Sequence, residues 1–201
     1  AHVRYLGDTA RLPYGTKSAD TVTRYALQAA SALLRDGAAV DAMVVACNTA
    51  SSCALPALDA HHEFPVLGVI EPGARRAVEA SRSGKIGVIG TERTVASRAY
   101  HQAINAIETD VQVFAKETPL LVGLAEEGWF DGPVVEAALH AYLAPWLRST
   151  AKEIDTLVLG CTHYPALKAA ISTSAQQLLG REITLIDSAE AIAQDLAERL
   201  P

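Results

Sequence analysis

Two cysteines in matching surroundings are the residues of this chain best suited to chemistry. Cys47 ends the segment DAMVVAC (41–47), and Cys161 ends the similar segment DTLVLGC (155–161). In each copy an Asp precedes four or five strand-like residues, and a small residue stands before the Cys. This imperfect internal repeat predicts that the two thiols occupy equivalent places in two similar α/β units.

A pair of facing thiols could invert a carbon stereocentre. Inversion by proton transfer needs a base on one face of the carbon and an acid on the other, with the roles exchanged in the reverse direction. Each thiol is expected at the carboxyl end of a parallel strand and at a helix N-terminus, which favours thiolate over a thiol of ordinary pKa, about 8.5. Inert packing of both cysteines is the alternative, and their matched surroundings favour the catalytic interpretation.

The residues after each thiol are suited to recognition of a small acid. Asn48 and Thr49 follow the first thiol, and Thr162 and His163 follow the second. Amide, hydroxyl and backbone N–H donors could hold carboxylates, and the imidazole of His163 could relay a proton to the second thiol. Helix capping by Asn and Thr, and a structural role for the His, remain open alternatives.

The segment GDTARLPYG (7–15) predicts a second polar loop. It places Asp8 at the carboxyl end of a predicted first strand, and Pro13 with Gly15 predicts a tight turn whose N–H groups could face a ligand. Composition alone also allows a plain turn in which Asp8 is a cap or an ion-pair partner.

Short runs rich in Val, Ile and Leu alternate with helical periodicity, which is typical of a parallel α/β fold. Ser18 or Thr16 is expected to cap the first helix, and Gly37 to mark its end. Strands are predicted at 3–6, 42–46, 66–70, 85–90, 111–115, 156–160 and 183–186. Further helices are expected near 50–60, 73–82, 94–107, 134–148, 165–179 and 188–200.

Two turn-prone segments are the predicted domain seams. They are Glu71-Pro72-Gly73 and Asp187-Ser188. Hinges at both would join residues 1–72 and 188–201 into one α/β domain and leave residues 73–187 as a second.

Composition restricts the class of protein. The net charge of −6 and the scattered Lys and Arg argue against a nucleic-acid partner, and the apolar runs are too short to span a membrane. No signal peptide is recognised, and an odd count of three cysteines predicts reduced thiols in a cytoplasmic protein. Residues 85–94 lack a nucleotide-binding fingerprint.

The third cysteine and metal binding are lesser considerations. Cys53 is predicted to lie inside a helix and to pack in the core. A metal site made from Cys47, Cys53, Cys161 and His163 matches no standard zinc spacing. We therefore expect no thiol-bound metal.

Motifs along nearly the whole chain resemble the glutamate racemases of the aspartate/glutamate racemase superfamily. The first and last of them favour this branch over the aspartate and hydantoin branches. The motifs are GDTARLPYGTKS (7–18), VVACNTAS (44–51), GVIEPG (68–73), GVIGTERTVAS (87–97), TPLLVGLAEEG (118–128) and LGCTHYPAL (159–167).

The resemblance implies two pseudo-symmetric, parallel-sheet α/β domains with the active site in the cleft between them. It implies a cytoplasmic isomerase that interconverts L- and D-glutamate without pyridoxal phosphate or metal and supplies D-glutamate for peptidoglycan, cell-wall biogenesis and cell shape. Cys47 would exchange the proton of D-glutamate and Cys161 that of L-glutamate. His163, with Glu126 behind it, would assist the second thiol, and Asp8 the first. Implied substrate contacts are Tyr14, Gly15, Asn48, Thr49, Thr91, Thr94, Thr162 and His163.

One departure from the family pattern concerns the N-terminus. Family members normally begin with a strand that leads into a motif of the form F-D-S-G-V-G-G, and the sequence as written starts after that point. A segment beyond the last helix is also absent, so the chain as written is expected to be less than fully active. Racemisation of aspartate or another small acid, and a binding or regulatory relative without catalysis, are the alternative functions, and a homodimer is left open.

Overall fold

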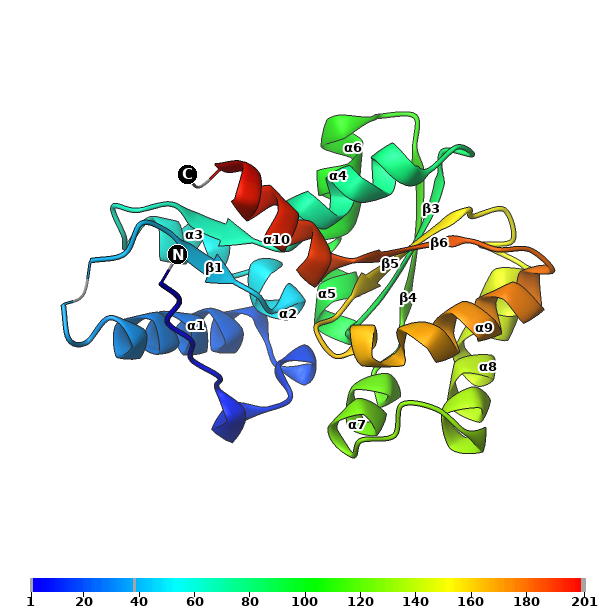
Figure 1. Cartoon of the computed structure of the whole chain (residues 1–201), viewed down its shortest axis with the longest axis horizontal. Coiled ribbons are helices and arrows are strands. Elements are labelled where there is room, and N and C mark those ends of the chain that lie inside the picture. The colour runs from blue at the N-terminus through cyan, green and yellow to red at the C-terminus, as the bar shows by residue number, and fades with distance from the viewer. Residues whose placement is uncertain (1, 38, 200–201) are drawn as a thin grey trace.

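Two parallel sheets organise the computed structural model, which describes residues 2–37 and 39–199 (Figure 1). The small sheet pairs β1 (Met43–Val45) with β2 (Val66–Gly68). The larger sheet has the strand order β4-β3-β5-β6. Its strands are β3 (Lys85–Gly90), β4 (Gln112–Glu117), β5 (Thr156–Gly160) and β6 (Thr184–Asp187). Every described strand pair is parallel, which confirms the predicted α/β class.

Helices fill the connections between the strands, as the alternation in the sequence predicts. The α-helices are α1 (Ala19–Leu33), α2 (Asn48–Ser51), α3 (Leu55–Asp59), α4 (Ile70–Ala80), α5 (Glu92–Ser97), α6 (Ala99–Ile107), α7 (Leu120–Glu126), α8 (Pro133–Arg148), α9 (Lys168–Leu179) and α10 (Ser188–Arg199). Short 3₁₀ helices are η1 (Thr9–Arg11), η2 (Tyr14–Thr16) and η3 (Tyr164–Leu167). Ser18 caps α1 by accepting a hydrogen bond from the backbone N–H of Thr21 at 3.2 Å, as one of the two predicted caps.

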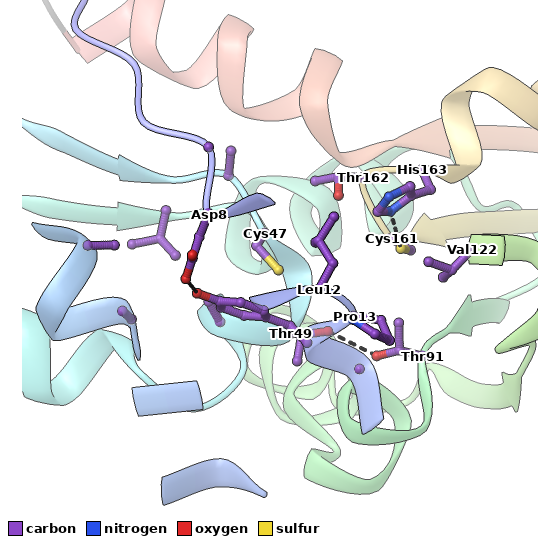
Figure 2. Close-up of a pocket in the computed structure, with 18 of the residues that line it drawn as sticks. Asp8, Leu12, Pro13, Cys47, Thr49, Thr91, Val122, Cys161, Thr162 and His163 are labelled. Carbon is purple, nitrogen blue, oxygen red and sulfur yellow. Dashed lines mark hydrogen bonds between the residues drawn. The ribbon is translucent and has the colours of Figure 1, made fainter. Parts of the chain in front are cut away.

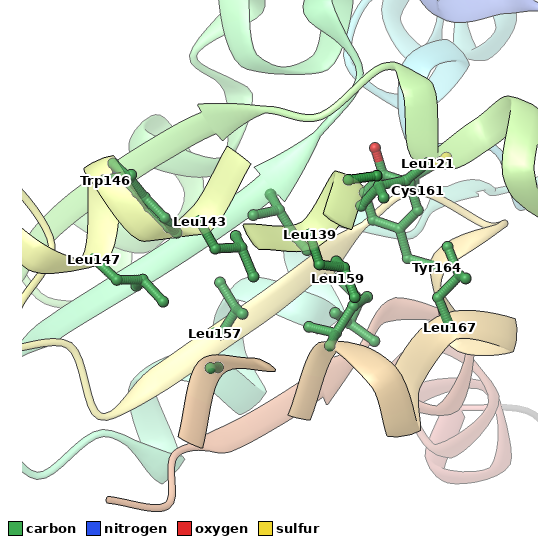
Figure 3. Packing of buried hydrophobic residues seen from close by; sticks show 14 of the residues in the cluster. Leu121, Leu139, Leu143, Trp146, Leu147, Leu157, Leu159, Cys161, Tyr164 and Leu167 are labelled. Atoms are coloured by element: carbon green, nitrogen blue, oxygen red, sulfur yellow. The ribbon is translucent and has the colours of Figure 1, made fainter. Parts of the chain in front are cut away.

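The larger sheet separates two apolar layers. Successive side chains of a strand point to opposite faces, so Leu157 and Leu159 of β5 pack toward α8 and α9 while Val158 packs toward α4 and α6. Every residue of β5 is buried, as expected for a strand covered on both faces. Figure 3 shows the leucines of α8 and β5 interdigitating, with Cys161 at the end of the same cluster. The core thus fixes the position of β5 and of the thiol that follows it.

The predicted strand at 3–6 is wrong. Residues 2–8 form no regular structure, and Val3 and Tyr5 are 81% and 88% exposed. The run Val-Arg-Tyr-Leu has no described neighbouring strand to pair with its backbone groups, so its composition alone does not make it a strand. Asp8 therefore lies in an irregular segment ahead of η1 instead of at a strand end.

The predicted turn at Glu71-Pro72-Gly73 is also wrong, because these residues form the first turn of α4. Pro is tolerated there, since the first N–H groups of a helix have no partner within it. The helix begins at Ile70, so β2 ends at Gly68, two residues before the predicted end.

Three further helices differ from the prediction. The helix expected at 94–107 is divided by Arg98, whose φ of 56° is left-handed, and the one near 50–60 is two short helices with Cys53 in the turn between them. The predicted placement of Cys53 inside a helix is therefore wrong, and its side chain is only partly buried. Helix α7 was not predicted at all.

The domain division stays a prediction. Helix α10 packs on α4, where Arg75 pairs with the buried Asp195 at 2.6 Å. Residues 1, 38 and 200–201 of the predicted domain ranges, and residue 200 of the predicted last helix, lie outside the described residues.

Asp155, which opens the second cysteine segment, secures the loop before β3. Its carboxylate accepts hydrogen bonds from Ser81 Oγ at 2.7 Å and from the backbone N–H groups of Arg82 at 2.7 Å and Ser83 at 2.6 Å. Burial acts to raise the pKa of Asp155, but these donors outweigh it and lower the pKa. The carboxylate is therefore more stable in the folded chain than in the unfolded chain.

We expect Asp155→Asn to lower the free energy of unfolding at pH 7 by roughly 1–3 kcal/mol, because an amide cannot accept all three bonds. The folded pKa is below the unfolded value of about 3.9, so this stabilisation is present above pH ~4 and is lost as pH falls through the folded pKa. Urea unfolding of wild type and variant from pH 7 to pH 3 measures the difference, with the exposed Asp110→Asn as control. A difference that stays constant over this range would contradict the assignment.

Candidate active site

A cavity of about 860 Å³ lies where the carboxyl ends of β1 and β5 approach each other. Cys47 follows β1 by two residues, Cys161 follows β5 directly, and both thiols line the cavity. Figure 2 shows Asp8 on the side of Cys47, and Thr162 and His163 on the side of Cys161. The predicted site residues that line the cavity are Asp8, Tyr14, Gly15, Cys47, Thr49, Thr91, Glu126, Cys161, Thr162 and His163.

Two polar groups lie in line behind the second thiol. His163 Nδ1 lies 3.5 Å from Cys161 Sγ, and His163 Nε2 is hydrogen-bonded to a carboxylate oxygen of Glu126. The carboxylate comes from α7, and the thiol and imidazole come from the loop after β5. A carboxylate behind an imidazole orients the ring, so this arrangement can exchange a proton with the thiol.

Burial keeps both thiols in the protonated form. It raises the pKa of the Cys161 thiol to about 12, against the lowering effect of the His163 N–H and the Thr162 hydroxyl. It also raises the pKa of the Cys47 thiol, although the N–H groups of Ala50 and Thr49 at the first turn of α2 act in the opposite direction. The expectation that helix N-termini lower the pKa of both thiols is therefore wrong, because desolvation outweighs the N–H donors.

Asp8 has two partners on the first side of the cavity. The hydroxyl of Tyr14 donates a hydrogen bond to it, and Arg11 Nε lies 3.2 Å from its second oxygen. Burial and the Asp8 carboxylate raise the pKa of Tyr14, so its hydroxyl remains a donor. The loop at 7–15 thus brings a carboxylate to the cavity, although no strand precedes it.

Three threonine hydroxyls connect the loops after β1 and β3. Thr49 Oγ1 lies 3.0 Å from Thr91 Oγ1 and 3.3 Å from Thr94 Oγ1, and the latter two hydroxyls are 3.0 Å apart. Thr91 also caps α5 by accepting a bond from the N–H of Thr94. The hydroxyls of Thr49 and Thr91 consequently reach the cavity from a fixed position.

Two predicted substrate contacts lie behind the cavity wall. Asn48 and Thr94 are 1% and 2% exposed and are absent from the lining. Asn48 instead bonds Tyr100 and Ser188, and Thr94 bonds the other threonines. Their position next to a thiol or a strand end gives no information on which way the side chain points.

Apolar residues of the lining were missed. Leu12, between η1 and η2, and Val122, in α7, both line the cavity (Figure 2). They provide surface that can exclude water from a bound molecule. Leu12 could have been noted from the sequence as an apolar side chain within the turn-forming segment 7–15. Val122 could not be identified, because helix α7 was not predicted.

Two other kinds of site are not found in the part of the chain that the structure describes. No three side chains of His, Cys, Asp or Glu there are grouped so as to hold a metal ion. Over the same residues, no helix has both the length and the apolar character that a membrane crossing requires.

Comparison with known proteins gives consistent matches. The model of the Asp/Glu/hydantoin racemase family matches residues 1–196. A glutamate racemase of Geobacter metallireducens is 54% identical over 197 residues, which cover 98% of this chain and 69% of that protein. The crystal structure of a Bacillus anthracis glutamate racemase isoform has a TM-score of 0.87 at 38% identity, with 96% of this chain and 70% of that chain covered. A Francisella tularensis glutamate racemase crystallised with D-glutamate has a TM-score of 0.80 at 33% identity, with coverage of 96% and 70%.

We expect Cys161 to react with iodoacetamide at a rate that keeps rising beyond pH 9. Only the thiolate reacts, and a pKa of about 12 keeps its fraction small at neutral pH. Mass spectrometry of the peptide that contains Cys161, after timed alkylation at each pH, measures this rate. In urea-unfolded protein the same peptide should reach a plateau above the ordinary thiol pKa of about 8.5, and a plateau near pH 9 in the folded protein would refute the expectation.

Gly15→Ala should destabilise the first side of the cavity. A Cβ on Gly15 would lie 2.5 Å from Thr91 Cβ and 2.6 Å from Thr91 Cγ2, so η2 or Thr91 must move. We expect a loss of about 1–3 kcal/mol, the usual cost of overpacking, in thermal or urea unfolding.

Gly123→Ala is the matched control for this substitution. Gly123 lines the same cavity from within α7, and an added Cβ meets nothing within 4 Å. Because Ala favours a helix over Gly by about 0.5–1 kcal/mol, this variant should be as stable as wild type or more so. Equal effects of the two substitutions would show that the approach of η2 to Thr91 is not tight.

Proposed function

Because the chain belongs to the Asp/Glu/hydantoin racemase family, we propose that it interconverts L- and D-glutamate by proton transfer at the α-carbon. Cys47 and Cys161 exchange the proton. The observation that carries the proposal is that both thiols line one cavity from the ends of two different parallel sheets. A substrate held between them presents opposite faces of its α-carbon to the two sulfur atoms.

The proposed reaction uses one thiolate and one thiol. The thiolate of Cys47 removes the α-proton of D-glutamate, and the thiol of Cys161 delivers its own proton to the opposite face to give L-glutamate. Cys47 ends as the thiol and Cys161 as the thiolate, which is the form that the reverse reaction requires. Negative charge on Cys47 raises the pKa of Cys161, so the pair favours a single ionised sulfur.

Polar neighbours assist each thiol in this proposal. His163 takes or returns the proton of Cys161, and Glu126 holds the imidazole in orientation. Asp8 assists on the side of Cys47, where Tyr14 and Arg11 hold its carboxylate. The two sides are therefore chemically different, although both end in a thiol.

Neutral donors are proposed to bind the two carboxylates of the substrate. Among the described residues that line the cavity, Arg4 is the single Arg or Lys. Its guanidinium is paired with Asp36 at 2.7 Å. The remaining donors are hydroxyls, backbone N–H groups and the His163 imidazole, for which an anion is a suitable ligand. The proposed substrate contacts are Tyr14, Gly15, Thr49, Thr91, Thr162 and His163, with Asn48 and Thr94 shaping the wall behind them.

The reaction as proposed needs no cofactor, because the chain's own side chains move the proton. The relatives are glutamate racemases, one of them crystallised with D-glutamate, and this supports glutamate as the substrate. We further propose that the reaction takes place in the cytoplasm and supplies D-glutamate for peptidoglycan. Assembly into a homodimer stays a prediction.

Circular dichroism of L- and D-glutamate, incubated separately with the protein and without added cofactor, tests the proposal. The optical signal should decay to zero from both enantiomers. Cys47→Ser and Cys161→Ser should each slow the decay by at least about a hundredfold, because each removes a proton-transfer group. Cys53→Ser is the control, since its thiol donates to the carbonyl of Thr49 and lies outside the described lining.

Aspartate is the comparison substrate in the same assay. Decay from aspartate with none from glutamate would show that the substrate assignment is wrong. An unchanged signal from both acids would show that the chain binds without catalysing racemisation.

A further inference from the structure

Tyr100, on α6, contacts the neighbours of both thiols. Its hydroxyl donates a hydrogen bond of 2.7 Å to Asn48 Oδ1, and Asn48 directly follows Cys47. Its ring lies against Gly160, which directly precedes Cys161: a Cβ on Gly160 would be 3.2 Å from Tyr100 Cε2. Tyr100 is 2% exposed, so the side chain is enclosed between the two thiol-bearing loops.

Ser188 forms a second connection between the same loops. Asn48 Nδ2 donates to Ser188 Oγ at 3.0 Å, and Ser188 Oγ lies 3.3 Å from the carbonyl oxygen of Leu159, to which it donates. Asn48 and Ser188 are each 1% exposed. Both the oxygen and the nitrogen of the Asn48 amide thus have a partner. The partners, Tyr100 and Ser188, belong to helices α6 and α10, which pack with the larger sheet.

These contacts matter because no backbone pairing joins the two sheets. The described strands form one sheet of two and one of four, so Cys47 and Cys161 belong to separate hydrogen-bonded units. Side chains that cross between the units must therefore set the separation of the sulfur atoms. Buried polar contacts suit this task, since they allow only a narrow range of geometry.

The packing around Tyr100 leaves little room for another arrangement. A Cβ on Gly73 would lie 3.3 Å from the Tyr100 hydroxyl oxygen, and a Cβ on Gly160 would lie 3.2 Å from Tyr100 Cε2. Glycine at both positions gives the ring access to the site between α4 and β5. Packing therefore holds the ring in place in addition to the hydrogen bond that its hydroxyl donates to Asn48.

We infer that Tyr100 is a positioning residue for the proposed racemisation: its ring rests on the Cys161 loop and its hydroxyl holds the Cys47 loop, so the two sulfur atoms stay on opposite faces of one carbon. This inference rests on the proposed function. Tyr100 is absent from the lining of the cavity among the described residues. It acts through Asn48, whose other end Ser188 secures.

Tyr100→Phe tests the inference because it keeps the ring and removes the hydroxyl. The buried Asn48 Oδ1 loses its partner, so the Cys47 loop keeps only the bond to Ser188 at this residue and can shift. A displacement on the order of 1 Å at a reacting group can cost up to about a hundredfold in turnover. We expect kcat to fall by about tenfold to a hundredfold, with little change in KM.

The partition of the deprotonated intermediate distinguishes positioning from stability. With enantiopure glutamate in D₂O, proton NMR and chiral chromatography measure deuterium at the α-carbon in the product and in the recovered substrate. If the thiol that must deliver the proton is misplaced, more intermediates return to the starting face. They do so after the thiol that removed the proton has exchanged it with solvent. The ratio of inversion to exchange should therefore fall severalfold in Tyr100→Phe.

Tyr164→Phe is the matched control. Tyr164 is fully buried, and its hydroxyl bonds Thr118 at 2.8 Å, so this variant also loses a buried hydroxyl near Cys161 but no connection to the Cys47 loop. Its ratio should equal that of wild type even if its melting temperature falls. An unchanged ratio in Tyr100→Phe, or an equal fall in Tyr164→Phe, would overturn the inference while leaving the proposed function intact. A wild-type protein that neither inverts nor exchanges would overturn both.

Discussion

The separation of two sulfur atoms that belong to different sheets is the constraint on which the rest of the structure depends. Each thiol stands at the carboxyl end of a parallel strand, but the two strands share no hydrogen bond. The dense core around β5 fixes Cys161, and the small sheet with α1 and α3 fixes Cys47. What relates them is a thin layer of buried polar contacts from Asn48 and Thr49. The apolar cores therefore fix the two ends of the cavity, and the buried polar contacts connect these ends.

Burial has opposite effects on binding and on ionisation. It removes water from the thiols, so that a nearby donor or charge acts strongly on them. The same burial raises the pKa of both thiols. A resting protein with neutral thiols is consistent with the proposed reaction, in which one thiol must lose its proton when the substrate binds. His163 with Glu126, and Asp8, are the groups placed to accept it.

The sequence is informative where local pattern and tertiary structure agree. The bounds of β3 and β5, the cap at Ser18 and the two thiols on one cavity all follow from apolar runs, capping chemistry and the internal repeat. Prediction from the sequence fails where the structure of a segment depends on its neighbours in the fold. Residues 3–6 have a strand-like composition but no paired strand, and Pro72 is tolerated because it falls in a first helical turn.

Side-chain direction is the other quantity that the sequence does not contain. Asn48 follows a thiol in the same way as Thr162. Its side chain nevertheless points toward Tyr100 and Ser188, away from the cavity that Thr162 lines. The thiol pKa values depend on burial in the same way, since a helix N-terminus can be read from the sequence but the exclusion of water cannot.

Racemisation of protiated L-glutamate in D₂O, followed by polarimetry, tests the central claim most directly. With two thiols acting on opposite faces, the product carries deuterium at the α-carbon, and the isotope effect slows its return. The rotation should therefore pass through zero to the opposite sign before it decays, and the same overshoot should appear from D-glutamate. A monotonic decay to zero from both enantiomers would mean that a single base serves both faces, and would contradict the account.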